Sequence, residues 1–290
     1  MSESCDVAQR VGIMQGRLLP PEPGRFQSFP RARWRDEFRF AAAAGLDAIE
    51  WIYDQFGADV NPIASDAGIV QVHALVRQSG VAVVSLCADF FMDRPIVHAT
   101  GDSLADLGAR LYWLIERCRR AGIGRMVIPF VDASRIETAE HESTVLALLR
   151  DVLPIAERSG VEIHLETALG PQDFARFLGR LPHPMLKVNY DAGNSAALGY
   201  RPAEELAAYG ERIGSVHVKD RVLGAGTVPL GSGSADLPEL FAGLARAGYR
   251  GDYVLQAARG AAGDEPALAK RNAAFVRQSV ERARAAPASR

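Results

Sequence analysis

The feature that most constrains this chain is a regular alternation of short β-like runs with longer helical segments from one end to the other. The segments between the runs, such as residues 103–121 and 140–159, carry apolar residues at helical spacing, and several end in a glycine stop. This alternation is typical of α/β folds. The eight β-like runs cover residues 11–18, 46–52, 81–88, 124–131, 161–167, 185–191, 213–220 and 251–257.

The number of units favours a (β/α)₈ barrel. Eight units in 290 residues give about 36 residues per unit, which is close to what such a barrel needs. A doubly wound open sheet is the competing architecture. No break in composition marks a boundary, so we expect a single domain over residues 1–290 with a frayed tail at 283–290. The longest irregular segment, LLPPEPGRFQSFPRARW, follows the first run, where barrels place active-face loops.

Charge and composition exclude several classes of partner. The 33 basic and 35 acidic residues give a net charge of −2, so no overall basic field is available to bind nucleic acid. The first residues lack the pattern of a signal peptide, and no apolar stretch is long enough to span a bilayer, which predicts a soluble, cytoplasmic protein. Three cysteines without ligand spacing indicate neither a disulfide framework nor a zinc ribbon. Residues 111–115, on a helix expected to be exposed, offer a surface for a homo-oligomer.

Polar residues alternate with apolar ones in the last four runs. Side chains two apart on a strand share a face, so the apolar set should meet the helices and the polar set should point into the barrel. Burying carboxylates, a lysine and an imidazole together is costly unless a cation or mutual pairing compensates. The expected interior residues are Glu162, His164 and Glu166, then Lys187, Asn189 and Asp191, then Ser215, His217 and Lys219, and finally Gln256.

Four of these residues lie in register near the strand ends and together predict a metal site. Glu166, Asp191, His217 and Gln256 supply three oxygens and one nitrogen from neighbouring strands. That set suits a divalent ion such as Mn²⁺, Mg²⁺, Co²⁺ or Zn²⁺ in a site that keeps positions open for substrate oxygens. The alternative is that they are ordinary interior polar residues satisfied by one another.

Four motifs in order resemble a known family. They are an ET in HLETALGPQ, a DxGN in VNYDAGNSAALGY, an HxKD in IGSVHVKD, and a PLGxG loop before the last run. With VGIMQGRLLPP and GLDAIEWIYD at the start, the chain resembles the xylose isomerase-like TIM-barrel family of sugar and sugar-phosphate isomerases and epimerases over nearly its whole length. The resemblance implies a divalent metal, most often Mn²⁺, and proton transfer through a cis-enediolate of a sugar or sugar phosphate.

The family holds its metal with two glutamates, an aspartate and a histidine, and here the resemblance carries only three ligands. These are Glu166, Asp191 and His217, whereas Gln256 stands where the second glutamate is usual. A glutamine ligates through its amide oxygen but transfers no proton at neutral pH. Glu166 therefore remains as the main base. A two-base epimerisation lacks its second carboxylate, whereas one-base aldose–ketose chemistry survives.

Further candidates lie around these ligands. Lys219 shares a face with His217 and is predicted either to polarise a substrate oxygen or neutralise a phosphate, or to pair with Asp191 or Glu166. His164 would orient Glu166 or a ligand, or be a satisfied core histidine.

Three more residues complete the predicted substrate contacts. Arg17 is a candidate for binding a terminal phosphate or carboxylate. Glu50 resembles a residue that binds sugar hydroxyls in the family, and is otherwise an interior ion-pair member. Asn194 would reach the substrate or shape the turn.

Three other functions compete with the isomerase or epimerase hypothesis. A dehydratase acting on a keto-sugar or keto-cyclitol would use the same enolate and expel a β-hydroxyl. A non-catalytic sugar-binding relative is compatible with the loss of the second carboxylate. Apurinic endonucleases share the fold, but they need several metals, more histidine ligands and a basic groove, so we expect no nucleic-acid partner.

Overall fold

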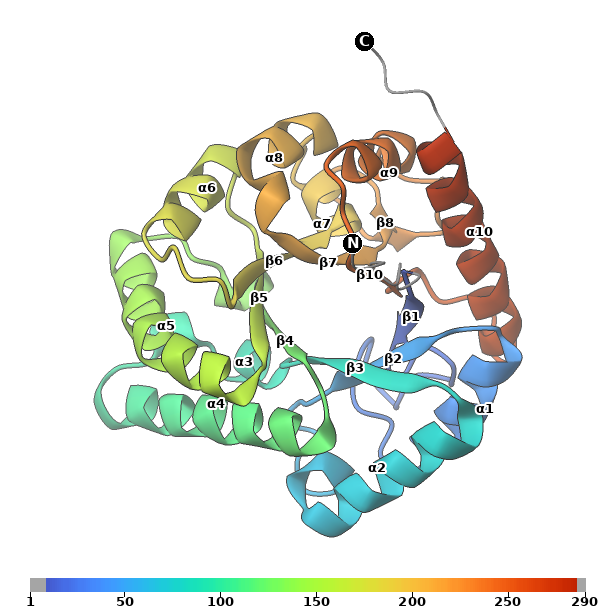
Figure 1. The fold of residues 1–290 in the computed structure, drawn as a ribbon, viewed down its shortest axis with the longest axis horizontal. Coiled ribbons are helices and arrows are strands. Elements are labelled where there is room, and N and C mark those ends of the chain that lie inside the picture. Colours follow the sequence, from blue (N-terminus) through green and yellow to red (C-terminus); the bar gives the residue numbers. More distant parts are fainter. Residues whose placement is uncertain (1–8, 286–290) are drawn as a thin grey trace, which may run out of the picture.

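The computed structural model describes residues 9–285, and its eight parallel strands close into a barrel in the order β1-β10-β7-β6-β5-β4-β3-β2. Each of the eight predicted runs contains one strand, and the predicted (β/α)₈ fold is confirmed (Figure 1). The barrel strands are β1 (Val11–Met14), β2 (Ala48–Ile52), β3 (Ala82–Cys87), β4 (Arg125–Phe130), β5 (Glu162–Thr167), β6 (Leu186–Asp191), β7 (Ile213–Val218) and β10 (Asp252–Leu255).

Helices form a ring outside the strands (Figure 1). Those described are α1 (Asp36–Ala43), α2 (Asp66–Ser79), α3 (Phe90–Asp93), α4 (Gly101–Ala121), α5 (Ala139–Ser159), α6 (Pro171–Gly179), α7 (Ala192–Ala197), α8 (Pro202–Tyr209), α9 (Leu237–Arg246) and α10 (Glu265–Ala285). Short 3₁₀ turns cover Pro62–Ala64, Ile96–His98, Asp132–Ser134 and Gly210–Arg212. A small antiparallel hairpin, β8 (Asp220–Arg221) with β9 (Thr227–Val228), follows β7. No described helix is both long and apolar enough to cross a membrane.

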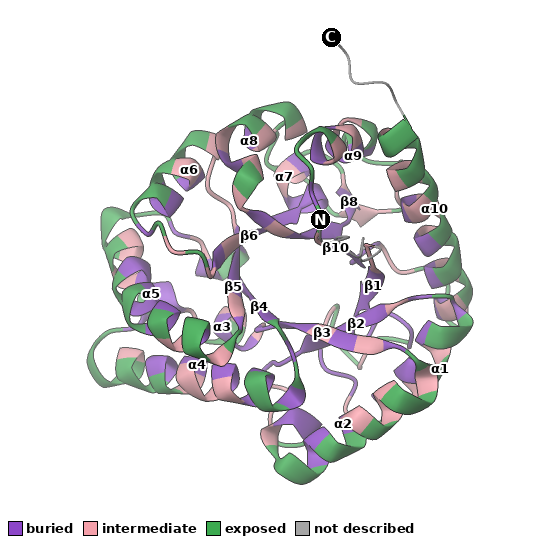
Figure 2. Cartoon of the chain, in the orientation of Figure 1, coloured by how far each residue is buried: buried purple, intermediate pink, exposed green. Residues whose placement is uncertain are grey.

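The hydrophobic core lies between the strands and the helices, where Figure 2 shows the buried residues gathered. On β5, Ile163 and Leu165 point outward and are fully buried under the helices, as the alternation predicts. The prediction of an exposed surface at residues 111–115 is wrong. Leu111, Leu114 and Ile115 are fully buried on the inner face of α4, because the apolar stripe of an amphipathic helix faces the core.

The predicted helix stops occur where the sequence places them. Gly122 and Gly160 follow α4 and α5 with φ values of 72° and 64°, a left-handed conformation that glycine adopts without steric cost. The prediction of a frayed tail is wrong for residues 283–285, which belong to α10. The rest of that predicted tail, residues 286–290, lies outside the described residues.

The first and last strands of the barrel are neighbours, and polar contacts strengthen that closure. Val11 is in register with Tyr253. The carboxylate of Asp252 pairs with Arg10 at 3.0 Å and with Arg125 at 2.7 Å. At the other end of the strands, Arg259 donates hydrogen bonds to the backbone oxygens of Gly16 and Leu19, both at 2.9 Å. The long loop after β1 is therefore fixed to the segment that follows β10.

Candidate active site

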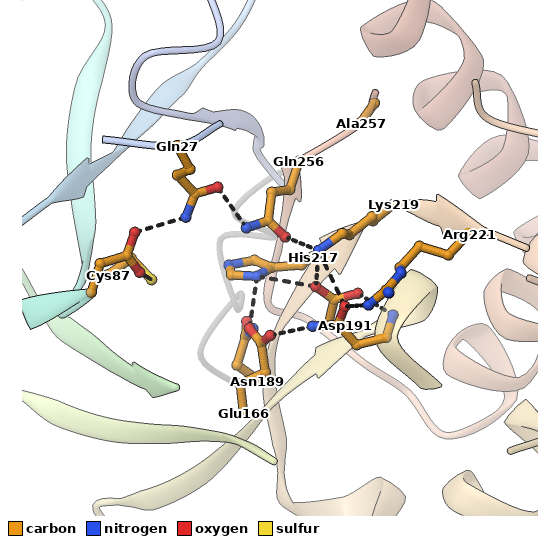
Figure 3. Close-up of polar contacts among 12 residues, drawn as sticks. Gln27, Cys87, Glu166, Asn189, Asp191, His217, Lys219, Arg221, Gln256 and Ala257 are labelled. Carbon is orange, nitrogen blue, oxygen red and sulfur yellow. Dashed lines mark hydrogen bonds and ion pairs between the residues drawn. The ribbon is translucent and has the colours of Figure 1, made fainter. Parts of the chain in front are cut away.

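Three predicted ligands converge at the carboxyl ends of adjacent strands. Glu166 lies near the end of β5, Asp191 ends β6, and His217 lies near the end of β7, in register with Asp191. One ligand atom from each lies within 4.8 Å of the others, and all three residues are buried (Figure 3). Parallel strands bring their carboxyl ends to one face of a barrel, which explains why residues far apart in sequence meet here.

His217 is oriented by Glu50 from below. Its Nε2 lies 2.6 Å from Oε1 of Glu50, and both side chains are completely buried. Its Nδ1 lies 3.1 Å from Oε2 of Glu166 and 3.9 Å from Oδ2 of Asp191, yet makes no hydrogen bond within the described residues. Burial favours the neutral imidazole, but the carboxylates of Glu50 and Glu166 outweigh it and raise the pKa of His217 to about 10.

Glu166 is held by two side-chain amides. Asn189 donates to its Oε2 at 3.0 Å and Asn194 donates to its Oε1 at 2.7 Å. Burial alone would raise the pKa of this carboxyl, but the adjacent charge of His217, with the charge of Lys219 and the hydrogen bond from Asn194, holds it below its usual value. Glu166 is therefore an ionised, precisely positioned carboxylate, which suits both a metal ligand and a base.

Lys219 lies among three oxygens of the same site. Its Nζ is 3.2 Å from Oδ1 of Asn194, 3.2 Å from Oε1 of Gln256 and 3.5 Å from Oδ2 of Asp191. Gly193 of the DxGN motif makes room for this side chain, because a Cβ at that position would lie 2.6 Å from Cγ of Lys219. The ammonium thus links Gln256 to the three-ligand group.

The amide of Gln256 is turned toward the site, and both its oxygen and its nitrogen form hydrogen bonds with other side chains. Its oxygen accepts from Lys219, and its Nε2 donates to Oε1 of Gln27 at 2.9 Å. Gln27 in turn donates through Nε2 to Oδ2 of Asp89 at 2.8 Å. We call Gln27 and Gln256 the amide bridge. Figure 3 shows it on one side of His217, with Glu166 on the other.

A cavity of about 930 Å³ opens above these residues. Glu166, Asn194, Lys219 and Gln256 line its floor. Its walls come from the proline-rich loop after β1, from the ends of β3 and β4, and from the β8–β9 hairpin. The first loop therefore lines the same cavity as Glu166 and Gln256. The cavity has the size of a small-molecule site.

Three other predicted site residues do not line this cavity. Glu50 lies beneath His217 and is fully buried, so its position is that of an orienting residue. His164 lies deeper in the barrel, with Nδ1 2.7 Å from Ser215 Oγ, which matches the core alternative. Arg17 lies behind Gln27, donating to it at 3.0 Å and to the backbone oxygen of Ala257 at 3.1 Å.

Sequence reasoning missed the roles of four residues at the site, three of which line the cavity. Gln27 lies within the long loop after β1, and Asp89 directly follows the run that forms β3. Periodicity does not specify the path of either loop. Arg221 lines the cavity and donates to Oδ1 of Asn194 at 2.9 Å. Asn189 was placed in the interior without a role, and its contact with Glu166 is the reason it matters.

The donor set fits a small divalent cation. Two buried carboxylates and an imidazole nitrogen without a hydrogen bond face one another, and the second nitrogen of that imidazole is held by a carboxylate. Metal-ligating histidines usually have this kind of second partner. Glu166, Asp191 and His217 would hold the ion, and the oxygen of Gln256 is available as a fourth ligand if it releases Lys219.

The family model described as xylose isomerase-like TIM barrel matches residues 38–279. The chain belongs to this family. Its curated relatives include an L-ribulose-5-phosphate 3-epimerase, UlaE, of Shigella flexneri serotype 5b, which is 27% identical over 234 residues covering 77% of this chain and 81% of that protein. A UlaE of Salmonella paratyphi C is 26% identical over 239 residues, with the same coverage of 77% and 81%.

Solved structures of sugar epimerases share the fold over almost the whole chain. An L-ribulose 3-epimerase superposes with a TM-score of 0.72 at 19% identity, covering 97% of this chain and 100% of that one. A D-allulose 3-epimerase from Methylomonas sp. also gives a TM-score of 0.72 at 19% identity, covering 94% and 98%. At this identity the likeness concerns the barrel alone.

Proposed function

We propose that this protein is a divalent-metal-dependent isomerase or epimerase of a sugar or sugar phosphate, with Glu166 as its main base. The observation that carries the proposal is the setting of Glu166. It shares a buried three-residue group with Asp191 and His217, and it also lines the floor of the cavity. The activity of the curated relatives, which are named as L-ribulose-5-phosphate 3-epimerases, supports the same class of reaction.

Each side chain has a part in this reaction. When bound, a divalent cation would polarise the substrate carbonyl and stabilise the negative charge of the enediolate. Glu166 takes the proton from the carbon beside that carbonyl, while Asn189 and Asn194 keep its carboxylate in place. Lys219 stabilises the charge that develops on a substrate oxygen, since its ammonium lies on the cavity floor. Glu50 keeps His217 in the orientation that presents Nδ1 to the site.

The cavity favours a sugar-sized, polar substrate. Lys219 and Arg221 supply positive charge on one side, which suits a hydroxylated chain and also a phosphate group. Ketoses and ketose phosphates are therefore the first substrates to test, together with the corresponding aldoses.

The test is incubation of the protein with this panel in D₂O and Mn²⁺, followed by mass spectrometry and NMR. We expect deuterium at the carbon beside the carbonyl, and its loss when the metal is removed by chelation. Calorimetric titration should show Mn²⁺ binding that Asp191→Asn weakens, independently of turnover. Loss of water from the substrate would identify a dehydratase instead. Tight sugar binding without any exchange would identify a non-catalytic relative.

A further inference from the structure

In the proposed reaction, one of the two proton transfers of an epimerisation has no side chain assigned to it. Epimerisation needs a proton removed from one face of the carbon and another delivered to the opposite face. Glu166 serves one face, but the amide of Gln256 neither delivers nor accepts a proton at neutral pH. A second carboxyl group would therefore have to lie elsewhere on the cavity wall. Besides Glu166, the wall carries Asp54, Asp89, Asp93 and Asp132.

Two of these four aspartates are engaged in holding the backbone. Asp54 accepts hydrogen bonds from the backbone N–H groups of Phe29 and Gly57, at 2.9 and 2.7 Å. Asp93 accepts from the backbone N–H of Gln55 at 2.9 Å. Both carboxylates hold loop backbone in place, so neither is free to turn toward a substrate without releasing that backbone.

Asp89 differs because only side chains hold it. Gln27 donates to its Oδ2 at 2.8 Å, and the thiol of Cys87 donates to its Oδ1 at 3.1 Å. The residue follows β3, lines the cavity and is partly exposed to it. Asp132, in contrast, is exposed in the 3₁₀ turn after β4, and its side chain forms no hydrogen bond with the amide bridge or with a predicted ligand.

The amide bridge connects Asp89 to the position of the absent carboxylate. Lys219 donates to the oxygen of Gln256, so the amide nitrogen of Gln256 must face Gln27, and the amide nitrogen of Gln27 must face Asp89. Each amide is thus oriented by the charge at one end, and the series ends at a carboxyl group. Asp89 is two hydrogen bonds, of 2.9 and 2.8 Å, from the side chain at position 256.

The surroundings of Asp89 also suit a group that both gives and takes a proton. Burial raises its pKa to about 6, against the hydrogen bonds from Gln27 and Cys87, and the negative charges of Asp54 and Glu166 raise it further. Arg17 is the positively charged group that acts on it from behind Gln27. A carboxyl group with such a pKa is present in both forms near neutrality, which is favourable for acid–base catalysis.

We infer that Asp89 is the second proton-transfer group of this enzyme and replaces the carboxylate that is missing at position 256. This inference rests on the proposed function. Glu166 removes the proton from the carbon beside the carbonyl, and the electron pair of that C–H bond enters the enediolate. The enediolate then takes the proton of the Asp89 carboxyl on its other face, which forms the new C–H bond and leaves Asp89 ionised. Proton exchange with water returns both carboxyl groups to their starting forms.

The test compares Asp89→Asn with Glu166→Gln on both epimers of a substrate, in D₂O and Mn²⁺. In Asp89→Asn we expect epimerisation to fall by about a hundredfold or more. Exchange at the carbon of the epimer that Glu166 deprotonates should persist, while exchange of the other epimer is lost. Glu166→Gln should show the reverse preference. Adding Gln256→Glu to Asp89→Asn should restore epimerisation, because the double variant regains a carboxylate on that side.

The matched control is Asp106→Asn, which removes a charge from an exposed position of α4 away from the cavity and should epimerise at the wild-type rate. Three results would overturn this inference without touching the proposed function. In the first, Asp89→Asn epimerises as fast as the wild type. In the second, Asp89→Asn slows epimerisation and also slows exchange of both epimers. In the third, the wild type isomerises without forming an epimer. Absence of exchange with every sugar in the wild type would overturn the proposed function as well.

Discussion

At the scale of single residues, the surroundings rather than the residue type decide what a carboxylate does here. Glu166, Glu50 and Glu37 are all buried, but they have different partners. Glu166 faces two amides and the cavity, Glu50 faces His217, and Glu37 accepts a hydrogen bond from the backbone of Gly16. The sequence places Glu50 on the correct face of its strand, yet periodicity does not specify depth in the barrel. That is why it was predicted at the substrate and lies beneath His217.

Replacing Glu166 by glutamine tests the base directly. Glu166→Gln keeps an oxygen ligand of similar shape but removes the proton acceptor, so solvent exchange at the substrate carbon should fall by about a hundredfold or more at saturating Mn²⁺. Exchange is measured by mass spectrometry, and bound metal is measured separately by elemental analysis. Glu162→Gln, on the same strand at the far end of the barrel, is the control and should retain exchange. Full exchange in Glu166→Gln would assign the proton to another group.

Gln256→Glu is expected to strengthen metal binding. It adds a third negative charge beside Asp191 and Glu166, so the Mn²⁺ dissociation constant should fall by roughly tenfold or more. Isothermal titration calorimetry measures this without any substrate. Gln71→Glu, on the exposed outer face of α2, adds the same charge far from the site and should leave affinity unchanged. An unchanged dissociation constant in Gln256→Glu would place residue 256 outside the ligand set.

At the scale of elements, the strands could be predicted well and the loops could not. The eight runs and the polar face of β5 follow from period-two alternation, which is a local property of the sequence. The loop after β7 depends instead on long-range contacts. Asp220 of the HxKD motif is fully buried and accepts hydrogen bonds from the backbone of Gly231, Gly233 and Ala235.

Asp220→Asn should therefore loosen this loop. The amide offers one acceptor oxygen in place of two, and it turns an N–H₂ group toward backbone donors, so the free energy of unfolding should fall by about 1–3 kcal/mol. Hydrogen exchange at the amides of residues 231, 233 and 235 should become at least about tenfold faster, as each bond contributes on the order of 1.4 kcal/mol. Asp236→Asn is the control, because asparagine caps α9 as well as aspartate does. Equal protection in both variants would contradict this role.

At the scale of the whole molecule, Glu37 makes stability depend on pH. Burial raises the pKa of this carboxyl from 4.5 to about 8, against hydrogen bonds from the backbone of Gly16 and Leu18. Between these two values the folded protein keeps a proton that the unfolded chain releases. The contribution of Glu37 to the free energy of unfolding is therefore fully present below pH 4.5, and this contribution is lost as the pH rises toward 8. Between these two pKa values, the free energy of unfolding falls by up to about 1.4 kcal/mol for each pH unit.

Glu37→Gln should remove this slope, because a neutral amide takes the place of the neutral acid. Denaturant unfolding between pH 5 and about pH 8, with chelator present, measures the effect. The variant should be more stable than the wild type at the upper end of the range and similar to it at the lower end. Asp36→Asn is the control, since the pKa of Asp36 is lowered by Arg33 and its titration lies below this range. Parallel curves for Glu37→Gln and the wild type would refute the argument.

The pairing of β1 with β10 has a consequence for how the chain is made. These strands are joined across 242 positions of sequence, as the contact between Arg10 and Asp252 shows. During synthesis, β1 leaves the ribosome before the other strands of the barrel, and it cannot pair with β10 until that strand has also emerged. Until then the nascent sheet is open, with unpaired edges at β1 and β7 that invite pairing with other chains. Because Gln256 follows β10, closure of the barrel and completion of the catalytic floor are one late event. A chain whose synthesis ends before β10 would therefore have unpaired strand edges that favour aggregation, and it would lack activity.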